Sequence, residues 1–222
     1  MRDFKPQDLA NTAWAFATTG IAATVLFHAI AVEAAQRVGE FNPQDLANTA
    51  WAFATTGIAA PALFDAIAAA ARRVRDFNPQ GLANTAWAFA TAGVAAPALF
   101  DAIAAEAARR VGEFNPQDLA NTAWAFAAAD CLSMESSLFD QRFARRCEAL
   151  SPEFNSEELR QLHQWRLWYA GERGCSDALP GAAPGALCRR FWGHGGHDFS
   201  FTEAGGGNAH IAWAVGAGGG CD

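Results

Sequence analysis

The sequence has few β-branched residues, no long apolar run and no excess of positive charge. Only 13 of its 222 residues are valine or isoleucine, whereas 53 of its 114 apolar residues are alanine. Strands favour β-branched side chains and helices favour alanine, so a sheet-rich fold is excluded and an all-α fold is expected. The other 61 apolar or aromatic side chains are enough for one domain-sized core.

The hydrophobic pattern of the sequence also predicts no membrane-spanning or export segment. The longest apolar candidate, residues 47–71, is interrupted by Gly57, Pro61 and Asp65, so we expect no membrane span. The opening residues, MRDFKPQD, include two aspartates and no apolar stretch. They therefore show neither a secretory signal nor an acid-poor targeting peptide.

Charge and cysteine content limit the binding chemistry. Sixteen Lys and Arg residues face 23 Asp and Glu residues, a net charge of -7, so general attraction to polyanions cannot drive binding. The cysteines are odd in number and keep no framework spacing, which predicts reduced thiols. They are Cys131, Cys147, Cys175, Cys188 and Cys221.

An internal repeat organises most of the chain. The segment LANTAWAFA occurs four times, at offsets of 37, 36 and 37 residues. Gly57 and Pro61 divide the unit into two helical halves. A period of this length predicts an α-solenoid of about four helix-hairpin repeats of 36–38 residues. The repeats begin near Phe4, Phe41, Phe77 and Phe114.

The start of each first helix is well specified. In the second repeat Asn42 is a capping residue, Pro43 suits the first helical position and Asp45 favours the first turn. The arrangement recurs after Phe77 and Phe114, and in divergent form from Phe154. We therefore expect a divergent capping helix that ends a repeat domain spanning residues 1–170.

Residues 171–222 differ in composition from the repeats. They contain 14 of the 20 glycines, which predicts a disordered tail. Its residues Cys175, Cys188, His194, His197 and His210 lack zinc-site spacing. Neither His28 nor His163 has an identifiable nucleophile beside it. We therefore predict no metal, no cofactor, no small-molecule substrate and no enzymatic activity.

Helical periodicity assigns faces to the first helix of the repeat. Leu46, Ala50 and Phe53 form one stripe, and Trp51 lies on a second stripe beside it. Both stripes are expected in the core, so the repeated tryptophans are interpreted as packing residues rather than as platforms for stacked bases. A narrow polar line remains, drawn through Gln44, Asn48, Ala52 and Thr55.

An Asn-Thr pair recurs in the middle of each first helix, although both residues disfavour helix. A solenoid would align these pairs into a ladder of hydrogen-bonding groups suited to an extended polymer. Two alternatives stay open: copying by recent duplication, and hydrogen bonds between neighbouring repeats. The pairs are Asn11 and Thr12, Asn48 and Thr49, Asn84 and Thr85, and Asn121 and Thr122.

Arginines recur late in the second helices. Arg72, Arg73, Arg109 and Arg110 are placed to contact the phosphates of a nucleic acid. The alternative is that they complement the negative end of the helix dipole.

The repeat FNPQDLANTAWAFATTGIAAPALFDAIAAAA resembles the octotricopeptide repeat, an α-solenoid helix pair found in algal organelle RNA factors. Similar repeats occur in FAST-kinase-like RAP-domain proteins and in a helical subunit of RNA-editing substrate-binding complexes. The segment LRQLHQWRLWYAGE also resembles the helix that precedes a RAP domain, although no RAP domain is recognisable.

This resemblance implies binding of single-stranded RNA in a mitochondrion or chloroplast, in transcript processing, stability, editing or translation. Protein partners in an RNA-processing complex are implied as well. Recognition positions in the first helix would correspond to the four asparagines and their neighbouring threonines. The alternative function is a protein-protein interaction scaffold that holds an extended peptide on the same concave surface.

Overall fold

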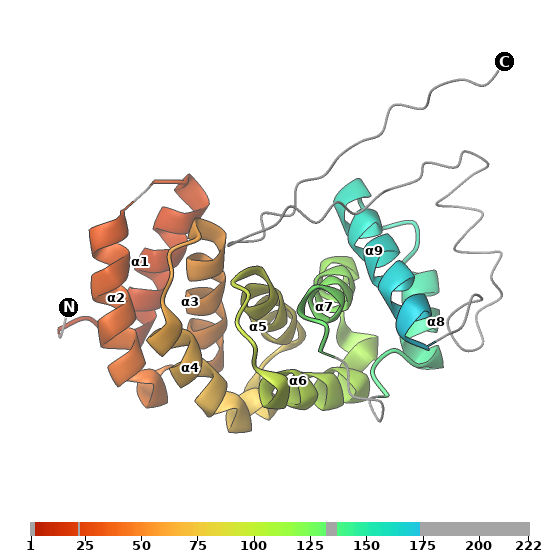
Figure 1. The fold of residues 1–222 in the computed structure, drawn as a ribbon, viewed down its shortest axis with the longest axis horizontal. Coiled ribbons are helices and arrows are strands. Elements are labelled where there is room, and N and C mark those ends of the chain that lie inside the picture. Colours follow the sequence, from red (N-terminus) through yellow and green to blue (C-terminus); the bar gives the residue numbers. More distant parts are fainter. Residues whose placement is uncertain (1–2, 22, 132–136, 174–222) are drawn as a thin grey trace, which may run out of the picture. The chain divides into compact units, whose positions relative to one another are not determined.

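A computed structural model describes residues 3–21, 23–131 and 137–173, in which all the regular elements are helical (Figure 1). The α-helices are α1 (Pro6–Thr19), α2 (Thr24–Gln36), α3 (Pro43–Thr56), α4 (Pro61–Ala69), α5 (Pro79–Thr91), α6 (Pro97–Arg110), α7 (Pro116–Ala129), α8 (Gln141–Ala149) and α9 (Ser156–Arg173). Short 3₁₀ segments are η1 (Val38–Glu40), η2 (Ala70–Asp76) and η3 (Val111–Glu113). The expected all-α repeat architecture is confirmed, whereas the tail prediction lies outside the described residues.

The helices begin where the capping residues predict. Asn42, Asn78 and Asn115 each accept a hydrogen bond through Oδ1 from the backbone N–H three residues later, at 2.8, 2.7 and 2.8 Å. The divergent helix α9 begins in the same way, because Asn155 Oδ1 accepts from the N–H of Glu158 at 3.0 Å. These caps satisfy N–H groups that have no partner within the helix.

The second helix of the second repeat is shorter than expected. The sequence predicts a helix from Pro61 to about Val74, but α4 ends at Ala69 and continues as the 3₁₀ segment η2. The stretch from the phenylalanine of the second helix to the start of the next repeat is one residue shorter in the second repeat than in the third. A 3₁₀ helix rises further per residue than an α-helix, so it spans a similar distance with fewer residues.

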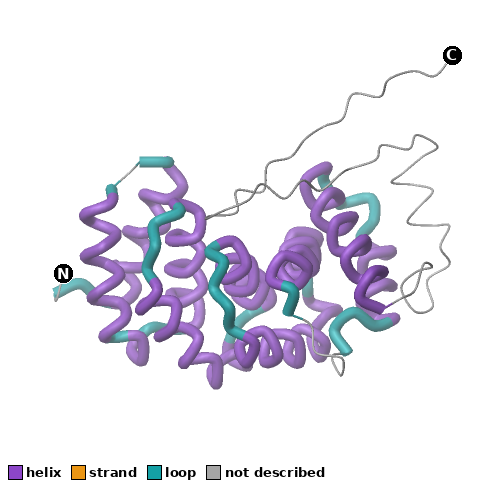
Figure 2. Tube along the Cα trace, viewed as in Figure 1, coloured by secondary structure: helices purple, strands orange, loops and turns teal. Residues whose placement is uncertain are grey.

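The helices form two layers. The first helices of the repeats, α1, α3, α5, α7 and α9, pack side by side in one layer, and α2 packs against α4 in the other. In Figure 2, short loops join α3 to α4 and α5 to α6. None of the described helices combines the length and the apolar character that crossing a membrane requires.

Phenylalanine pairs join each repeat to the next. A second-helix ring meets a first-helix ring of the following repeat edge to face in Phe27–Phe53, Phe64–Phe89 and Phe100–Phe126, at centroid distances of 5.0, 5.0 and 5.1 Å. All of these rings are buried. Since edge-to-face pairs are favoured in cores, the same aromatic contact fixes the step between repeats along the array.

Candidate nucleic-acid interface

One face of each first helix carries a repeated row of uncharged polar side chains and an indole. The row occupies positions spaced by four, three and four residues, which lie on one side of an α-helix. We call it the amide–indole stripe. It consists of Gln7, Asn11, Trp14 and Thr18 on α1; Gln44, Asn48, Trp51 and Thr55 on α3; Gln80, Asn84, Trp87 and Thr91 on α5; and Gln117, Asn121, Trp124 and Ala128 on α7.

The stripe corrects the faces predicted from the sequence. Trp51 was expected in the core and Ala52 on the polar line, but Trp51 is only half-buried and Ala52 is fully buried. The reason is steric, because a methyl group lets neighbouring helices approach closely where an indole would not fit. Trp14 is 48% exposed and Trp87 is half-buried, so the indoles reach the surface in the first three repeats.

The indoles of successive repeats form a row. The ring centroids of Trp51 and Trp87 are 6.5 Å apart, and those of Trp87 and Trp124 are 6.3 Å apart, with interplanar angles of 30° and 37°. Packed helix axes are usually about 8–10 Å apart. These three rings therefore lean toward one another over the α3–α5 and α5–α7 junctions and form an aromatic row along that part of the stripe.

Helix α9 closes the row at one end. Gln161 Nε2 donates to Asn121 Oδ1 at 3.2 Å, and Trp124 Nε1 donates to Gln164 Oε1 at 3.0 Å. Trp124 is consequently only 8% exposed. The sequence interpretation missed both glutamines. Aligning Asn155 with Asn115 would have found them, since it sets Gln161 opposite Asn121 and Gln164 opposite Trp124.

The predicted asparagines and threonines differ in how exposed they are in the structure. Asn11 is exposed, and Asn48 and Asn84 are half-buried; neither of these last two side chains has a hydrogen-bond partner among the described residues. By contrast, the threonines of the second, third and fourth repeats are 1–2% exposed and lie inside the array. These interior residues are Thr49, Thr85 and Thr122.

The threonine hydroxyls serve the helix itself where they have a partner. Thr12 and Thr49 donate to the carbonyl oxygens of Asp8 and Asp45, both at 2.7 Å. Such bonds to the preceding turn are a common alternative for threonine in a helix. Among the candidate base-contacting residues, the asparagines rather than these buried threonines present polar atoms at the surface.

The predicted phosphate-contacting arginines have different surroundings. Arg72 and Arg73 lie in η2, but their side chains are outside the described part of the chain. The Arg109 side chain is 66% exposed and pairs with Glu106, with Nη2 and Oε1 2.5 Å apart. Its neighbour Arg110 is 17% exposed and pairs with Glu113 at 2.7 Å. Only Arg109 is an exposed guanidinium among the two whose side chains are described.

Arg110 also belongs to a repeated backbone contact. Its Nη1 donates to the carbonyl oxygen of Phe77 at 2.7 Å, which ties the end of the second helix to the start of the same repeat. The same contact recurs at 2.9 Å from Arg37 to Phe4 and from Arg146 to Phe114. These arginines therefore hold the repeat together, a role that neither phosphate binding nor the helix dipole had suggested.

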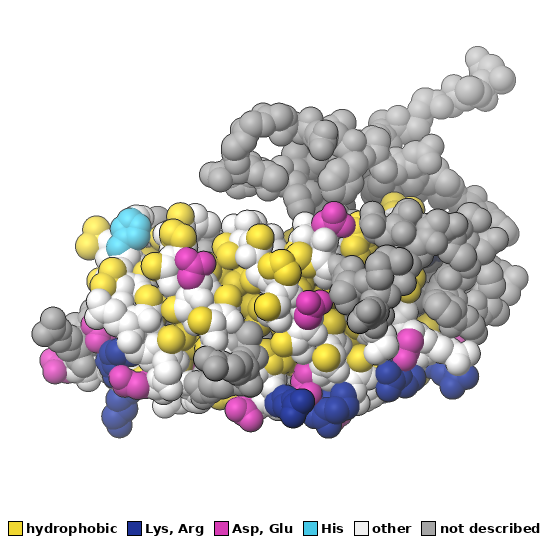
Figure 3. Space-filling model, turned by 60° about the horizontal axis from the view of Figure 1, so that its bottom comes forward, with side chains coloured by type: hydrophobic (Ala, Val, Ile, Leu, Met, Phe, Trp, Pro, Cys, Tyr) yellow, Lys and Arg dark blue, Asp and Glu magenta, His cyan; other side chains and the backbone are white. Residues whose placement is uncertain are grey.

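Charged side chains gather along one edge of the molecule. Figure 3 shows Lys and Arg together with Asp and Glu at the lower edge, whereas hydrophobic and uncharged side chains fill most of that face. The contact between Arg110 and Phe77 places the Arg110 guanidinium by the N-terminal end of α5. The amide–indole stripe itself carries no charge.

Burial changes the acidity of carboxyl groups near the first helices. Desolvation raises the pKa of Asp45 and Asp118, although hydrogen bonds from Asn42 and Asn115 oppose the shift. The Arg109 guanidinium instead lowers the pKa of Glu106 through a hydrogen bond, against the effect of burial. Glu106 is therefore held as a carboxylate between two arginines.

The described residues include no group of three or more His, Cys, Asp and Glu side chains that could hold a metal ion. Cys147 is buried and Cys131 is half-buried, and both are free thiols. His28 is exposed, whereas His163 is half-buried on α9 and burial lowers its pKa. The other three predicted thiols and the three histidines of the tail lie outside the described residues.

Comparison with known proteins connects this arrangement to one family. Residues 2–168 match the family described as RNA-editing substrate-binding complex 6 protein. No curated protein matches the sequence. The matched segment contains the four repeats and most of α9. The chain therefore belongs to the RNA-editing substrate-binding complex 6 protein family.

Proposed function

We propose that the protein binds single-stranded RNA along the amide–indole stripe and acts as a non-catalytic subunit in organelle RNA metabolism. The observation that supports the proposal best is the combination of unpaired asparagine amides and half-buried indoles on adjacent first helices. Asn48 and Trp51 are repeated one helix further along by Asn84 and Trp87. An amide offers both donors and an acceptor to a base edge, and an indole offers a stacking surface.

Binding on this surface depends on hydrogen bonds and stacking more than on charge. The net charge of -7 and the uncharged stripe give no broad attraction for the phosphate backbone. Arg109, whose side chain is 66% exposed, is the predicted phosphate-contacting arginine that best suits such a contact among those with described side chains. With so few cations involved, affinity should fall only slightly with salt, unlike that of strongly basic RNA-binding proteins.

Family membership supports the cellular setting of the proposal. The name of the family places its members in a substrate-binding complex for RNA editing. We extend this to the present chain as a role in an RNA-editing complex, with other proteins of that complex as partners, in the mitochondrion. A short array of about four repeats contacts few bases, so such partners would supply the rest of the specificity.

A second candidate is that the stripe holds an extended peptide. The spacing of 6.3–6.5 Å between indoles is close to the length of two residues in a β-strand, roughly 6.6 Å. Alternate side chains of a peptide could then meet Trp51 and Trp87, the two indoles of this row that α9 leaves half-buried. The acidic net charge is compatible with a peptide ligand.

Fluorescence anisotropy with the four homopolymeric RNAs at two salt concentrations tests the proposal. We expect saturable binding that differs among the bases and weakens only modestly at the higher salt concentration. Absence of binding to every RNA at the lower salt concentration would contradict RNA binding. Binding that is equal for all bases and is abolished by salt would instead indicate backbone attraction, contrary to the proposed contacts.

A further inference from the structure

One residue breaks the repeat at the start of α5. The third helical position is Asp8 in α1, Asp45 in α3 and Asp118 in α7, but it is Gly81 in α5. In the other three helices, the backbone N–H of the capping residue donates to that aspartate at 3.0, 3.3 and 3.2 Å. The N–H of Asn78 has no such carboxylate.

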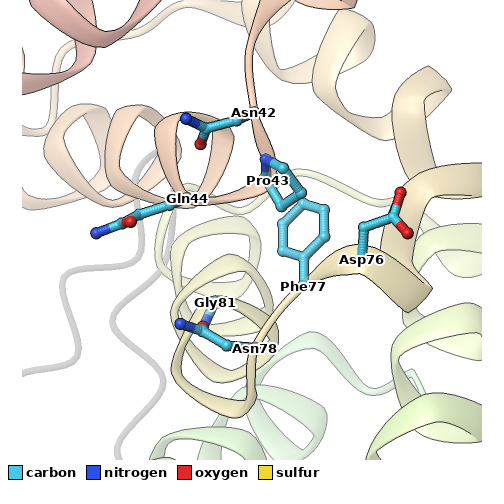
Figure 4. A pocket seen from close by; sticks show the side chains of 7 residues that line it. All are labelled: Asn42, Pro43, Gln44, Asp76, Phe77, Asn78 and Gly81. Atoms are coloured by element: carbon cyan, nitrogen blue, oxygen red, sulfur yellow. The ribbon is translucent and has the colours of Figure 1, made fainter.

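A groove opens at this interruption, between the N-terminal ends of α3 and α5. Its volume is about 230 Å³. The lining residues are Asn42, Pro43, Gln44, Asp76, Phe77, Asn78 and Gly81 (Figure 4). In that view the Phe77 ring lies below Pro43, with Asp76 on one side and Gln44 and Asn78 on the other. Two neighbouring repeats therefore contribute to the same groove.

The absence of a side chain at Gly81 keeps the groove open. A Cβ atom there would lie 3.1 Å from Asn78 Oδ1 and 3.2 Å from Phe77 Cδ1. Both distances are short, but the fold tolerates a side chain at this position. In two other repeats Asp45 and Asp118 occupy it, next to an asparagine and a phenylalanine. An aspartate at residue 81 would thus be accommodated by the fold while it narrowed the groove and added a negative charge.

The polar groups of the groove have defined roles. Asn42 and Asn78 use Oδ1 to cap their helices, so their Nδ2 groups remain as donors. Gln44 is exposed and offers both a donor and an acceptor. Asp76 is also exposed and is an acceptor. Donors thus lie beside an apolar wall of Pro43 and Phe77, and a carboxylate lies across from them.

This chemistry suits a nucleobase better than a phosphate. A phosphate would be repelled by the Asp76 carboxylate and would gain nothing from Pro43 or Phe77. A base instead presents acceptors to the amide donors, places its ring against the apolar wall and donates an N–H to Asp76. Guanine is the best match, because its two adjacent N–H donors can both reach one carboxylate.

We propose that this groove is a base-binding subsite, with a preference for guanine, for one nucleotide of single-stranded RNA. This inference rests on the proposed RNA-binding function. It gives one position in the array a base preference of its own, which repeats with identical residues cannot provide. A guanidinium lies close to the groove, since Phe77 lines it and the Phe77 carbonyl accepts a hydrogen bond from Arg110.

The test compares octauridine with the same RNA carrying one internal guanosine, by fluorescence anisotropy on the full chain. The wild-type protein should bind the guanosine RNA about fivefold or more tightly. Gly81→Asp should abolish this preference, yet keep or raise the thermal midpoint, because it restores the capping box of the other repeats. Gly112→Asp is the matched control. It adds the same charge at a position with open space around it and should keep the preference.

A second variant changes the groove without changing its backbone. Asp76→Asn removes the charge of an exposed side chain and should also reduce the guanosine preference several-fold, with the thermal midpoint unchanged. A preference that persisted in both Gly81→Asp and Asp76→Asn would overturn the subsite. Equal wild-type binding of both RNAs would overturn the subsite alone. Failure of the wild-type protein to bind either RNA would contradict the proposed function as well.

Discussion

Arg110 reaches back across its own repeat and donates a hydrogen bond from Nη1 to the backbone carbonyl of Phe77, 2.7 Å away. The adjacent Arg109 is 66% exposed and contacts only Glu106 among the described ion pairs. The two neighbouring arginines thus differ in role: Arg110 connects the two ends of its repeat, whereas the side chain of Arg109 lies largely in solvent. The phosphate-binding prediction for this pair therefore applies best to Arg109.

Replacement of these arginines should affect stability unequally. Arg110→Ala removes a charged hydrogen bond to a carbonyl and the contact with Glu113, so we expect a loss of about 1.5–3 kcal/mol in the free energy of unfolding. Arg109→Ala, with its exposed side chain, should cost less than about 1 kcal/mol. Urea denaturation of both variants checks the difference. Equal losses would contradict a structural role specific to Arg110.

Acid should weaken the array through Glu106. The hydrogen bond from Arg109 lowers the pKa of Glu106 below its ordinary value of 4.5. A carboxyl group with a lowered pKa in the folded state stabilises the protein above its ordinary pKa, and this contribution is lost as pH falls through the folded value. Glu106→Gln should therefore be less stable than the wild type at neutral pH. The difference should shrink between about pH 5 and pH 3.

Urea midpoints of the wild type and Glu106→Gln across this pH range provide the measurement. Glu33→Gln is a suitable control, since Glu33 occupies the equivalent position in the first repeat and pairs with Arg37 at 3.2 Å. Its effect should be smaller, because its side chain is more exposed than that of Glu106. A constant difference between Glu106→Gln and wild type at all pH values would contradict the proposed ion-pair contribution.

Gly57 should be required at the end of α3. Its φ of +66° lies in the left-handed region, where a side chain costs roughly 1–2 kcal/mol. Gly57→Ala should lower the free energy of unfolding by about that amount. Gly39→Ala is the control, because Gly39 has open space around it and is not among the described glycines with positive φ. Thermal denaturation showing equal effects at both positions would contradict this assignment.

Much of the fold could be predicted because each repeat carries its own boundary signals. Asn42 and Pro43 mark the start of α3, and Gly57 and Pro61 mark the change to the second helix. These are local effects of backbone conformation and capping, so they can be identified without knowing the neighbours. The shortening of α4 depended instead on the distance to the next repeat, which local preferences do not report.

The surface was harder to predict than the helices. Trp51 and Ala52 are neighbours in the sequence but lie about 100° apart on the helical wheel. Hydrophobicity alone places the indole inside. Packing decided otherwise, because the contact between α3 and its neighbours requires the smaller residue. Likewise, the partner of Asn121 comes from α9, whose sequence has diverged from the repeat. This partner can be recognised in the sequence only after α9 is aligned with α7 through Asn155 and Asn115.

The most direct test of the account measures the affinity of the double variant Asn48→Ala/Asn84→Ala for single-stranded RNA, alongside Asn121→Ala. Asn48 and Asn84 have amides open to a ligand, whereas the amide of Asn121 is already bound by Gln161. We predict that the double variant binds about tenfold or more weakly and that Asn121→Ala stays close to wild type. Unchanged affinity of the double variant, with the fold intact, would contradict base recognition by the amide–indole stripe.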